Sequence, residues 1–296
     1  MRPVAVTLLI CTRNRCASLA ATLASVTRAV AAADGIAIEV ILVDNGSTDA
    51  TPQLIAQWRT EQPFRVALVE EPRPGLARAR NRGLLHRTGD IVAMTDDDCI
   101  LHPDYFARLV AAFDKVAGPA IIGGRILLGN PADLPVTVKL EDHPMVAPPD
   151  SFPGGFVMGA NLAFGADVLD AVGPFDERFG AGARFVAAED TDFLLRASGF
   201  GIPILYDPLI VVDHHHGRRD TRDETSLLAG YSFGDGALYA KHVLTDKRVR
   251  RMLIADLWDV RLDVLRPVTT HAGVRRFYLF RLLHKTRGFL SYCRRG

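Results

Sequence analysis

Residues 36–58, IAIEVILVDNGSTDATPQLIAQW, decide the fold class, because they hold a strand, a turn and a helix in direct succession. Residues 36–44 are an apolar run of strand length, and the NGSTD segment that follows supplies turn and helix-capping residues. Helical spacing continues to residue 58, with Pro52 tolerated in the first turn. The same alternation extends outward, and it predicts strands at 4–12, 64–72 and 90–98 and helices at 16–30 and 74–89. We therefore expect an α/β fold: a mostly parallel sheet, flanked by helices, that binds ligands at the carboxyl ends of its strands.

The chain beyond residue 100 has a less regular pattern. Seven of the 17 prolines of the whole chain lie between residues 119 and 153, which predicts a long, partly mobile excursion over the sheet. After it we expect a strand in 154–164, a helix in 188–199 and a strand pair in 202–214. These elements suggest a main domain over 1–217, with halves 1–100 and 101–217, and a helical extension over 218–296.

Composition indicates a folded globular protein, since 48% of the 296 residues are hydrophobic and 23% are charged. No run approaches the roughly 18 uninterrupted apolar residues of a membrane span, and we expect no secretory leader. The four cysteines form no CxxC pair, which favours free thiols in a reducing, cytoplasmic compartment over disulfides or structural zinc. Neither GxGxxG nor GxxxxGK[ST] occurs, so dinucleotide and Walker-type sites are not indicated.

Charge divides the chain unevenly. Residues 247–296 hold 13 Lys and Arg against 3 Asp, a net charge of +10, whereas residues 1–246 carry −9. Basic, aromatic and aliphatic residues alternate in this tail at helical spacing, which suits a helix on an anionic membrane surface. The alternative is that the tail packs on the acidic main domain. Because the main domain has no basic face evident from the sequence, we expect no nucleic-acid partner.

Three adjacent carboxylates, Asp96, Asp97 and Asp98, end the strand predicted at 90–98. They would repel one another at a ligand-binding edge unless a cation neutralised them, although a solvated acidic turn is the alternative. Asp96 and Asp98 would share one face of an extended segment and suit a hard divalent ion such as Mg²⁺. One imidazole of residues 214–216, above all His214, could complete such a site.

Other polar residues also occupy the ends of predicted elements. Asp44 ends the second strand, where a carboxylate can accept hydrogen bonds from a ribose or base. Thr12 and Arg13 close the first strand, and Arg78 and Arg80 lie on the third helix; an Arg fork could bind a diphosphate, although each arginine alone suits a surface position.

Glu189 and Asp190 begin the helix predicted at 188–199. Acidic residues favour a helix N-terminus, so the helix dipole alone could account for them. Two adjacent carboxylates at this position are also well placed to supply a general base.

These segments together resemble the family 2 glycosyltransferases of the GT-A fold. The resemblance extends over residues 5–217, through ICTRNR, ILVDNGSTD, GLARARNRGL, GDIVAMTDDD, GANLAF, VGPFDERFG, AEDTDFLLR and VVDHHHG, in the family's order. It implies that residues 1–100 bind a nucleotide diphosphate sugar and that residues 101–217 bind the acceptor. Thr95 and Cys99 flank the triad where the family often has a hydrophobic residue and a further acid, which leaves open which two aspartates bind the metal.

The resemblance also implies roles for individual residues. It assigns Asp190 as the base, Asp96 and Asp98 with Mg²⁺ or Mn²⁺ as the metal site, and a pocket for sugar and acceptor. The donor-side residues are Thr12, Arg13, Asp44, Arg80, Asp96 and Asp97, and the pocket residues are Gly159, Ala160, Asn161 and Glu189.

The function that follows is inverting, metal-dependent transfer of a sugar to a saccharide or lipid-linked acceptor in polysaccharide or glycolipid biosynthesis. A sugar nucleotidyltransferase is a rival, but CTRNRCAS lacks the glycines of a phosphate loop. A non-catalytic carbohydrate-binding relative is a second rival, although such a protein would not need the carboxylates. We expect a cytoplasmic protein whose tail contacts the inner face of the membrane if the acceptor is lipid-linked.

Overall fold

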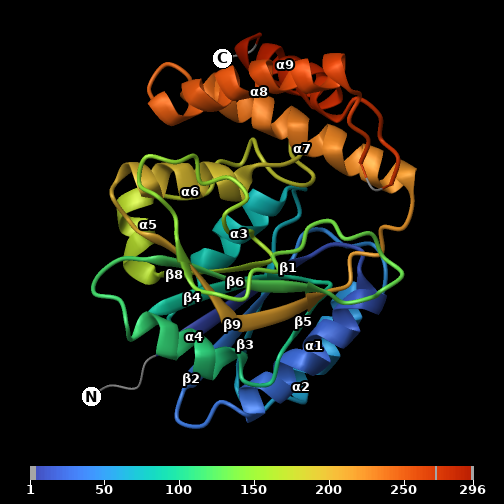
Figure 1. Cartoon of the computed structure of the whole chain (residues 1–296). Helices are drawn as coiled ribbons and strands as arrows, with labels where there is room; N and C mark the ends of the chain where they lie inside the picture. Colours follow the sequence, from blue (N-terminus) through green and yellow to red (C-terminus); the bar gives the residue numbers. More distant parts are fainter. Residues whose placement is uncertain (1–4, 271, 295–296) are drawn as a thin grey trace.

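The computed structural model describes residues 5–270 and 272–294. A mixed sheet with helices on both faces forms its centre (Figure 1), as the sequence predicted. The strand order is β3-β2-β1-β4-β8-β6-β9-β5, with β7 paired to β9. The strands are β1 (Ala5–Thr12), β2 (Ala37–Asp44), β3 (Arg65–Glu70), β4 (Ile91–Asp96), β5 (Cys99–Leu101), β6 (Ile121–Leu128), β7 (Met145–Val146), β8 (Asn161–Gly165) and β9 (Ile204–His214). The helices are α1 (Cys16–Ala31), α2 (Thr51–Thr60), α3 (Leu76–Leu84), α4 (Tyr105–Phe113), α5 (Ala166–Val172), α6 (Glu189–Gly199), α7 (Thr221–His242), α8 (Lys247–Leu265) and α9 (Phe277–Cys293).

The first four strands are parallel, and helices α1, α2 and α3 connect them as predicted. The register pairs Thr12 with Asp44 and Cys11 with Asp96. The polar residues that end β1, β2 and β4 are therefore brought to one edge of the sheet, where parallel α/β sheets bind their ligands.

The proline-rich segment differs from the expectation. Residues 121–128 form β6, which pairs with both β8 and β9 inside the sheet. The run IIGGRILL contains no proline, since Pro119 and Pro131 lie outside it, so all its backbone amides can join the ladder. Only the later part, residues 129–160, follows the predicted irregular path, interrupted by β7.

Two further predictions about elements were wrong, and two helices were not predicted. The strand expected in 154–164 begins only at Asn161, and helices α4 and α5 were not foreseen. Residues 204–214 form one strand, not a pair. Its pairing with β6 jumps from Asp207 to Val211, so Pro208 lies in the irregularity, where no ladder hydrogen bond is required of it.

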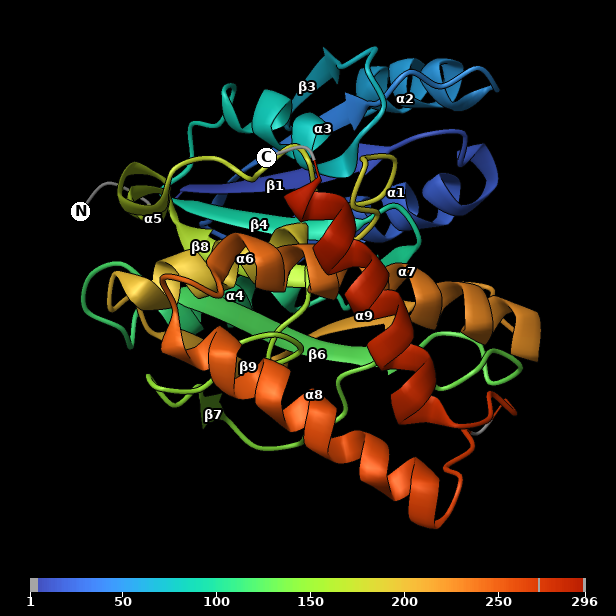
Figure 2. The same ribbon diagram turned by 90° about the horizontal axis from the view of Figure 1, so that it is seen from above.

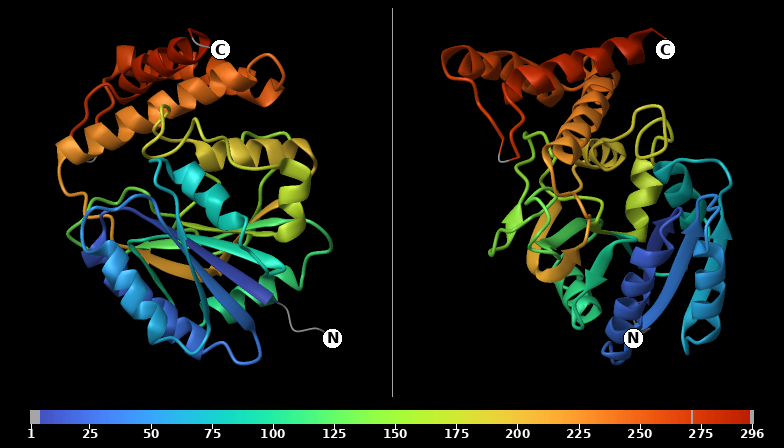
Figure 3. Two further views of the ribbon diagram at one scale, coloured as in Figure 1. Left: turned by 180° about the vertical axis from the view of Figure 1, so that it is seen from behind. Right: turned by 90° about the vertical axis from the view of Figure 1, so that its right-hand side faces the viewer.

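Alternate side chains of the strands build two cores. Leu8 and Ile10 of β1 face the layer of α1, α2 and α4, whereas Leu9 faces α3, α5 and α6. The extension, α7 to α9, forms a further layer over α3 and α6 (Figures 1 and 3). Within the described residues, no helix combines the length and the apolarity needed to cross a bilayer.

Helices α7 and α9 pack with their backbones in close contact, and they cross when seen from above (Figure 2). Gly236 of α7 and Gly288 of α9 make this approach possible. A Cβ atom on Gly236 would overlap the carbonyl oxygen of Lys285, and one on Gly288 would overlap that of Phe233. The absence of side chains at these two glycines therefore sets the short distance between α7 and α9.

Candidate functional site

A cavity of about 1260 Å³ lies between the carboxyl ends of the strands and the C-terminal helices. It brings together most of the site residues predicted from the sequence: Thr12, Arg13, Arg80, Asp96, Asp97, Asp98, Gly159, Ala160, Glu189, Asp190 and His214. Residues more than 200 positions apart along the chain thus share one cavity.

The three aspartates adopt a turn. Strand β4 ends at Asp96, the next two residues turn, and β5 begins at Cys99. The expectation that Asp96 and Asp98 share one face of an extended segment is therefore wrong. The solvated acidic turn is also excluded for Asp97 and Asp98, whose side chains are buried, whereas that of Asp96 is partly exposed to the cavity.

Asp97 is held by the first strand and the start of α1. Thr12 donates its hydroxyl to Oδ2 of Asp97 at 2.7 Å, and Nε of Arg15 lies 3.4 Å from Oδ1. Burial raises the pKa of Asp97 to about 6, against the opposing effects of Thr12 and Arg15. Arg15 belongs to the same TRNR segment as Thr12 and Arg13, but our sequence analysis did not select it.

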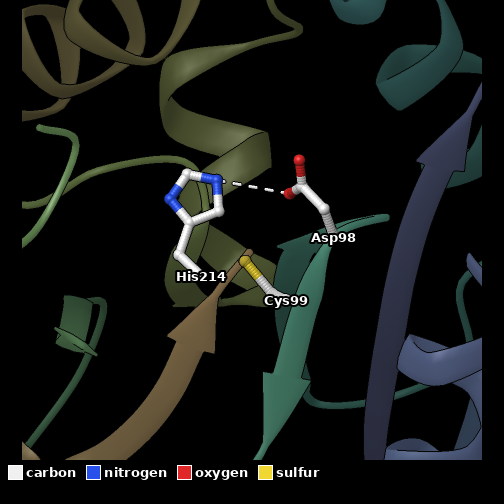
Figure 4. Close-up of side chains that lie close together, drawn as sticks. All are labelled: Asp98, Cys99 and His214. Carbon is white, nitrogen blue, oxygen red and sulfur yellow. Dashed lines mark ion pairs between the residues drawn. The ribbon is translucent and has the colours of Figure 1, made fainter. Parts of the chain in front are cut away.

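Asp98 faces His214 across the end of β9 (Figure 4). Nε2 of His214 lies 3.2 Å from Oδ1 of Asp98, and Arg15 donates to Oδ2 at 2.8 Å. Burial opposes ionisation of Asp98, but His214 and Arg15 together lower its pKa below the usual value. Oδ1 of Asp98 is buried and accepts no well-formed hydrogen bond from the described part of the chain. A carboxylate oxygen left in this way is a position for a cation.

Cys99 is the third potential ligand close to Asp98 and His214. Burial raises the pKa of its thiol well above the ordinary value. Hard cations prefer the oxygen atoms of the neighbouring aspartates. The donor set therefore favours Mg²⁺ or Mn²⁺ over a thiolate-bound metal.

The structure separates the three consecutive histidines. Only His214 lines the cavity; His215 is exposed, and Nε2 of His216 lies 3.1 Å from the carbonyl oxygen of Leu134. Burial opposes protonation of His214, but the adjacent Asp98 raises its pKa overall.

Arg80 connects the aspartate turn to helix α6. Its side chain is buried, with NH1 2.8 Å from Oε1 of Glu189 and NH2 3.6 Å from Oδ1 of Asp96. Burial raises the pKa of Glu189, as does the neighbouring Asp190, while the Arg80 guanidinium opposes this. Arg80 is therefore held between a carboxylate of the aspartate turn and one at the start of α6.

Asp190 lies beside Glu189 but is partly exposed to the cavity. The backbone amide of Gly159 donates to Oδ2 at 3.0 Å, and that of Thr191 donates to Oδ1 at 2.7 Å. The residue before the helix, Ala188, has a left-handed backbone with φ of 74°. This geometry aims the first turn of α6 at the cavity, and the helix N-terminus stabilises a carboxylate there.

Three predicted residues do not line the cavity: Asp44, Asn161 and Arg78, which instead pairs with Glu177 at 3.0 Å. Asp44 accepts a hydrogen bond from the amide of Ser47 and so stabilises the turn after β2. Asn161 is buried beneath the pocket, where its amide donates to the carbonyl oxygens of Arg125 and Ile210 and its Oδ1 accepts from Tyr105. Asn161 thus holds strands together instead of contacting a ligand. Among the described residues, Asn45 takes the place at the cavity that was expected for Asp44.

The extension supplies a wall of the cavity that was not foreseen from the sequence. Tyr231 and Asp235 of α7, Asp256 of α8 and Lys285 of α9 line it. Nζ of Lys285 lies 2.6 Å from Asp256 and donates to the hydroxyl of Tyr239, so the three helices are tied together at this wall. Their helical pattern was visible in the sequence, but no local signal places one of their faces over the sheet.

The sequence is similar to those of known glycosyltransferases. Residues 7–134 match the family described as glycosyl transferase family 2. Glycosyltransferase AglE of Haloferax volcanii is 27% identical over 57% of this chain, and a glucosyl-dolichyl phosphate glucuronosyltransferase of the same organism is 28% identical over 57%. These matches span 53% and 56% of the two relatives, so the chain spans just over half the length of each.

A solved structure shares the fold over nearly the whole chain. The mannosyltransferase PcManGT from Pyrobaculum calidifontis, in complex with GDP-Man and Mn²⁺, superposes with a TM-score of 0.64 at 18% identity. The match covers 98% of this chain and 75% of the other. The architecture, including the position of the C-terminal helices in the chain, is therefore that of a GT-A glycosyltransferase.

Proposed function

We propose that this protein transfers a sugar, with inversion, from a nucleoside diphosphate donor to an acceptor hydroxyl, because residues 7–134 match glycosyl transferase family 2 and the chain has the GT-A fold. The observation that carries the proposal is one cavity that joins the aspartate turn to the partly exposed Asp190. Within this one cavity, the aspartate turn can hold the leaving diphosphate with its cation, and Asp190 can accept the proton of the attacking hydroxyl.

The residues of the aspartate turn fit a divalent cation. Oδ1 of Asp98 is buried without a good hydrogen bond, and Asp96 adds a carboxylate that is partly exposed to the cavity. We assign Asp96, Asp98 and His214 as the residues that would hold Mg²⁺ or Mn²⁺. When bound, such a cation would offset the negative charge of the nucleoside diphosphate leaving group.

Asp190 is the proposed general base. It would accept the proton of the acceptor hydroxyl as that oxygen bonds to the anomeric carbon and the bond from carbon to diphosphate oxygen breaks. The amides of Gly159 and Thr191 orient its carboxylate, and each of its oxygens accepts one of these hydrogen bonds. Glu189 is less suited, because it is buried against Arg80 at 2.8 Å.

We assign the residues that bind the donor from their positions in the cavity. Thr12 and Arg13 lie beside the aspartate turn, and Arg80 reaches the cavity from α3. We propose that these residues and Asp97 frame the donor, and that Gly159, Ala160 and Glu189 frame the transferred sugar and the acceptor. The relatives' names place two of them in glycosyl transfer, one of these on a dolichyl phosphate substrate, which supports a saccharide or lipid-linked acceptor.

A thermal-shift panel tests the donor assignment. Sugars linked to UDP, GDP or dTDP are each added with Mn²⁺ or with a chelator, and we expect one nucleotide class to raise Tm with metal only. A ligand at about 100 times its Kd stabilises the native state by about 2.7 kcal/mol, which corresponds to a shift of roughly 5 °C or more. Stabilisation by a nucleoside triphosphate and a sugar 1-phosphate as well as by the nucleotide sugar that they would form would instead support a nucleotidyltransferase.

A further inference from the structure

The two sides of helix α8, one facing solvent and one facing the rest of the molecule, differ in composition. Residues that fall on the outer half of the helix at about 100° per residue are exposed, and we call them the α8 outer face. They are Arg250, Arg251, Ile254, Leu257, Trp258, Arg261, Leu262, Val264 and Leu265. Lys247, in the first turn of α8, is also exposed on this side, but it pairs with Asp150 of the main domain at 2.8 Å. The apolar members are well exposed, from 39% for Leu262 to 81% for Leu265. A solvated helix normally presents polar residues on this side.

All three acidic residues of α8 lie on the opposite half. Asp256 pairs with Lys285, Asp259 lines the cavity, and Asp263 accepts hydrogen bonds from the amides of Val268 and Leu279. The α8 outer face therefore carries three arginines and no acid. Helix α9, which packs beside α8, contains no acidic residue and exposes Leu283, Arg287 and Leu290 in addition.

We propose that the α8 outer face docks on an anionic lipid bilayer, with α8 lying in the plane of the interface. The charge selects this occupant: a surface with arginines and without acids complements anionic headgroups, and apolar side chains between them can enter the acyl boundary. The guanidinium of Arg261 lies 4.9 Å from the ring centre of Trp258, an amphipathic pair suited to the headgroup level. The position also suits docking, because α8 and α9 form an outer layer of the molecule (Figures 2 and 3).

The position of α8 also indicates how a lipid-linked acceptor could reach the cavity, an inference that rests on the proposed function. Met252, Asp256 and Asp259, on the inner half of the helix, line the cavity that holds Asp190. In this arrangement only helix α8 would lie between the bilayer surface and the cavity. A hydroxyl or phosphate carried on a lipid would reach the cavity beside α8 without leaving the membrane.

Tryptophan fluorescence tests docking in the intact chain. The chain has two tryptophans, and Trp58, on α2, is buried with 7% exposure, so changes on adding vesicles report on Trp258. We expect a blue shift and protection from acrylamide with phosphatidylglycerol-containing vesicles at low salt, and at least tenfold weaker partitioning onto pure phosphatidylcholine. Raising the salt to 0.5 M should weaken binding, since it screens the arginines. Absence of any shift with anionic vesicles overturns the proposal.

Paired variants locate the surface. Leu257→Ser/Leu262→Ser and Arg250→Glu/Arg251→Glu keep the Trp258 reporter, and each should reduce vesicle binding at least tenfold. Leu85→Ser/Phe200→Ser, which removes exposed apolar residues of the main domain, is the matched control and should bind like the parent. Equal binding by all three variants overturns the assignment of the face. So does light scattering that shows a dimer of the parent and monomers of the leucine variant.

Calorimetry of nucleotide binding with Mn²⁺, without vesicles, keeps this result separate from the proposed function. We expect the variants of the outer face to bind nucleotide like the parent, since none of their residues lines the cavity. Vesicle binding without nucleotide binding would overturn the enzymatic proposal alone, and the reverse would overturn the docking proposal alone.

Discussion

Asp190 and Glu189 are neighbours in the sequence, but the fold gives them different surroundings. The carboxylate of Asp190 is partly exposed and is oriented by two backbone amides. That of Glu189 is buried and paired with Arg80. A proton acceptor must reach the reacting hydroxyl, and the exposure favours Asp190.

Replacement of the base should separate chemistry from binding. Asp190→Asn retains the size of the side chain but accepts no proton, so we expect transfer to fall by about 10²-fold or more with little change in donor affinity. Steady-state transfer and donor calorimetry measure the two quantities. Glu189→Gln is the matched variant, and it should weaken the hold on Arg80 without removing the base. Near-normal turnover in Asp190→Asn with loss of turnover in Glu189→Gln would reverse the assignment.

Asp98 should control the dependence on metal. Asp98→Ala removes the carboxylate whose Oδ1 is buried without a good hydrogen bond, so nucleoside diphosphate should bind the variant equally weakly with Mn²⁺ and with chelator. In the parent we expect binding at least tenfold tighter with Mn²⁺ by calorimetry. Asp213→Ala, beside His214 but paired with His102 outside the cavity, is the control and should keep the metal effect. If Asp98→Ala binds like the parent, the metal assignment fails.

At the scale of elements, the contact between α7 and α9 depends on two glycines. Gly236→Ala and Gly288→Ala each place a methyl group against a backbone oxygen of the partner helix, which can yield only if the helices separate. We expect each variant to lose about 1–3 kcal/mol of unfolding free energy, measured with urea. In Gly230→Ala, also on α7, the new Cβ meets Val186 at an ordinary 3.4 Å, and the variant should be unchanged or slightly more stable. Equal stability of all three variants would contradict this account of the packing.

A buried ion cluster joins the extension to the rest of the molecule. Asp192 on α6 is fully buried and accepts from Lys241 at 2.6 Å, with His242 at 2.7 Å and Arg196 at 2.9 Å. Burial opposes ionisation, but His242, Lys241 and Arg196 together lower the pKa of Asp192 to about 2. Because α7 supplies two of the three partners, Lys241 and His242, the cluster fixes the extension over the cavity.

The cluster predicts how stability of the whole molecule responds to acid. A carboxyl whose pKa is lower in the folded state stabilises the fold above its unfolded value near 4, and this contribution is lost as the pH falls toward 2. Asp192→Asn should remove it at all pH values and lower the unfolding free energy at pH 7 by about 3 kcal/mol, because it leaves buried cations unpaired. The decline of stability between pH 4 and 2 should then be shallower than in the parent.

Asp104→Asn is the control for Asp192→Asn. It removes a carboxylate from an exposed ion pair with Arg108, for which we expect a change below about 0.5 kcal/mol. Urea unfolding followed from pH 7 to pH 2 measures both variants. Identical acid profiles for Asp192→Asn and the parent would show that other groups govern the acid response.

The sequence by itself determined the α/β fold class and the residues that gather at the sheet edge. Apolar periodicity fixes the first four strands and the first three helices locally, and parallel connection brings β1, β2 and β4 to the same edge, so Thr12 and Asp96 were predictable as neighbours. Asp190 and His214 were chosen as candidates from their positions at the start of a helix and the end of a strand, and the resemblance assigned Asp190 as the base, but no local signal links either residue to that edge.

Only the tertiary structure decided the geometry and the boundary of the site. The turn that separates Asp97 and Asp98 from Asp96, the burial of Asn161 and the pairing of Arg80 with Glu189 depend on contacts between distant segments. The orientation of the extension was also decided by tertiary contacts. Its charge and its helices were predicted from the sequence, but the half of α8 that lines the cavity is set by packing against α9. Local patterns record which residues are apolar, whereas side-chain environments arise from long-range packing that no local pattern encodes.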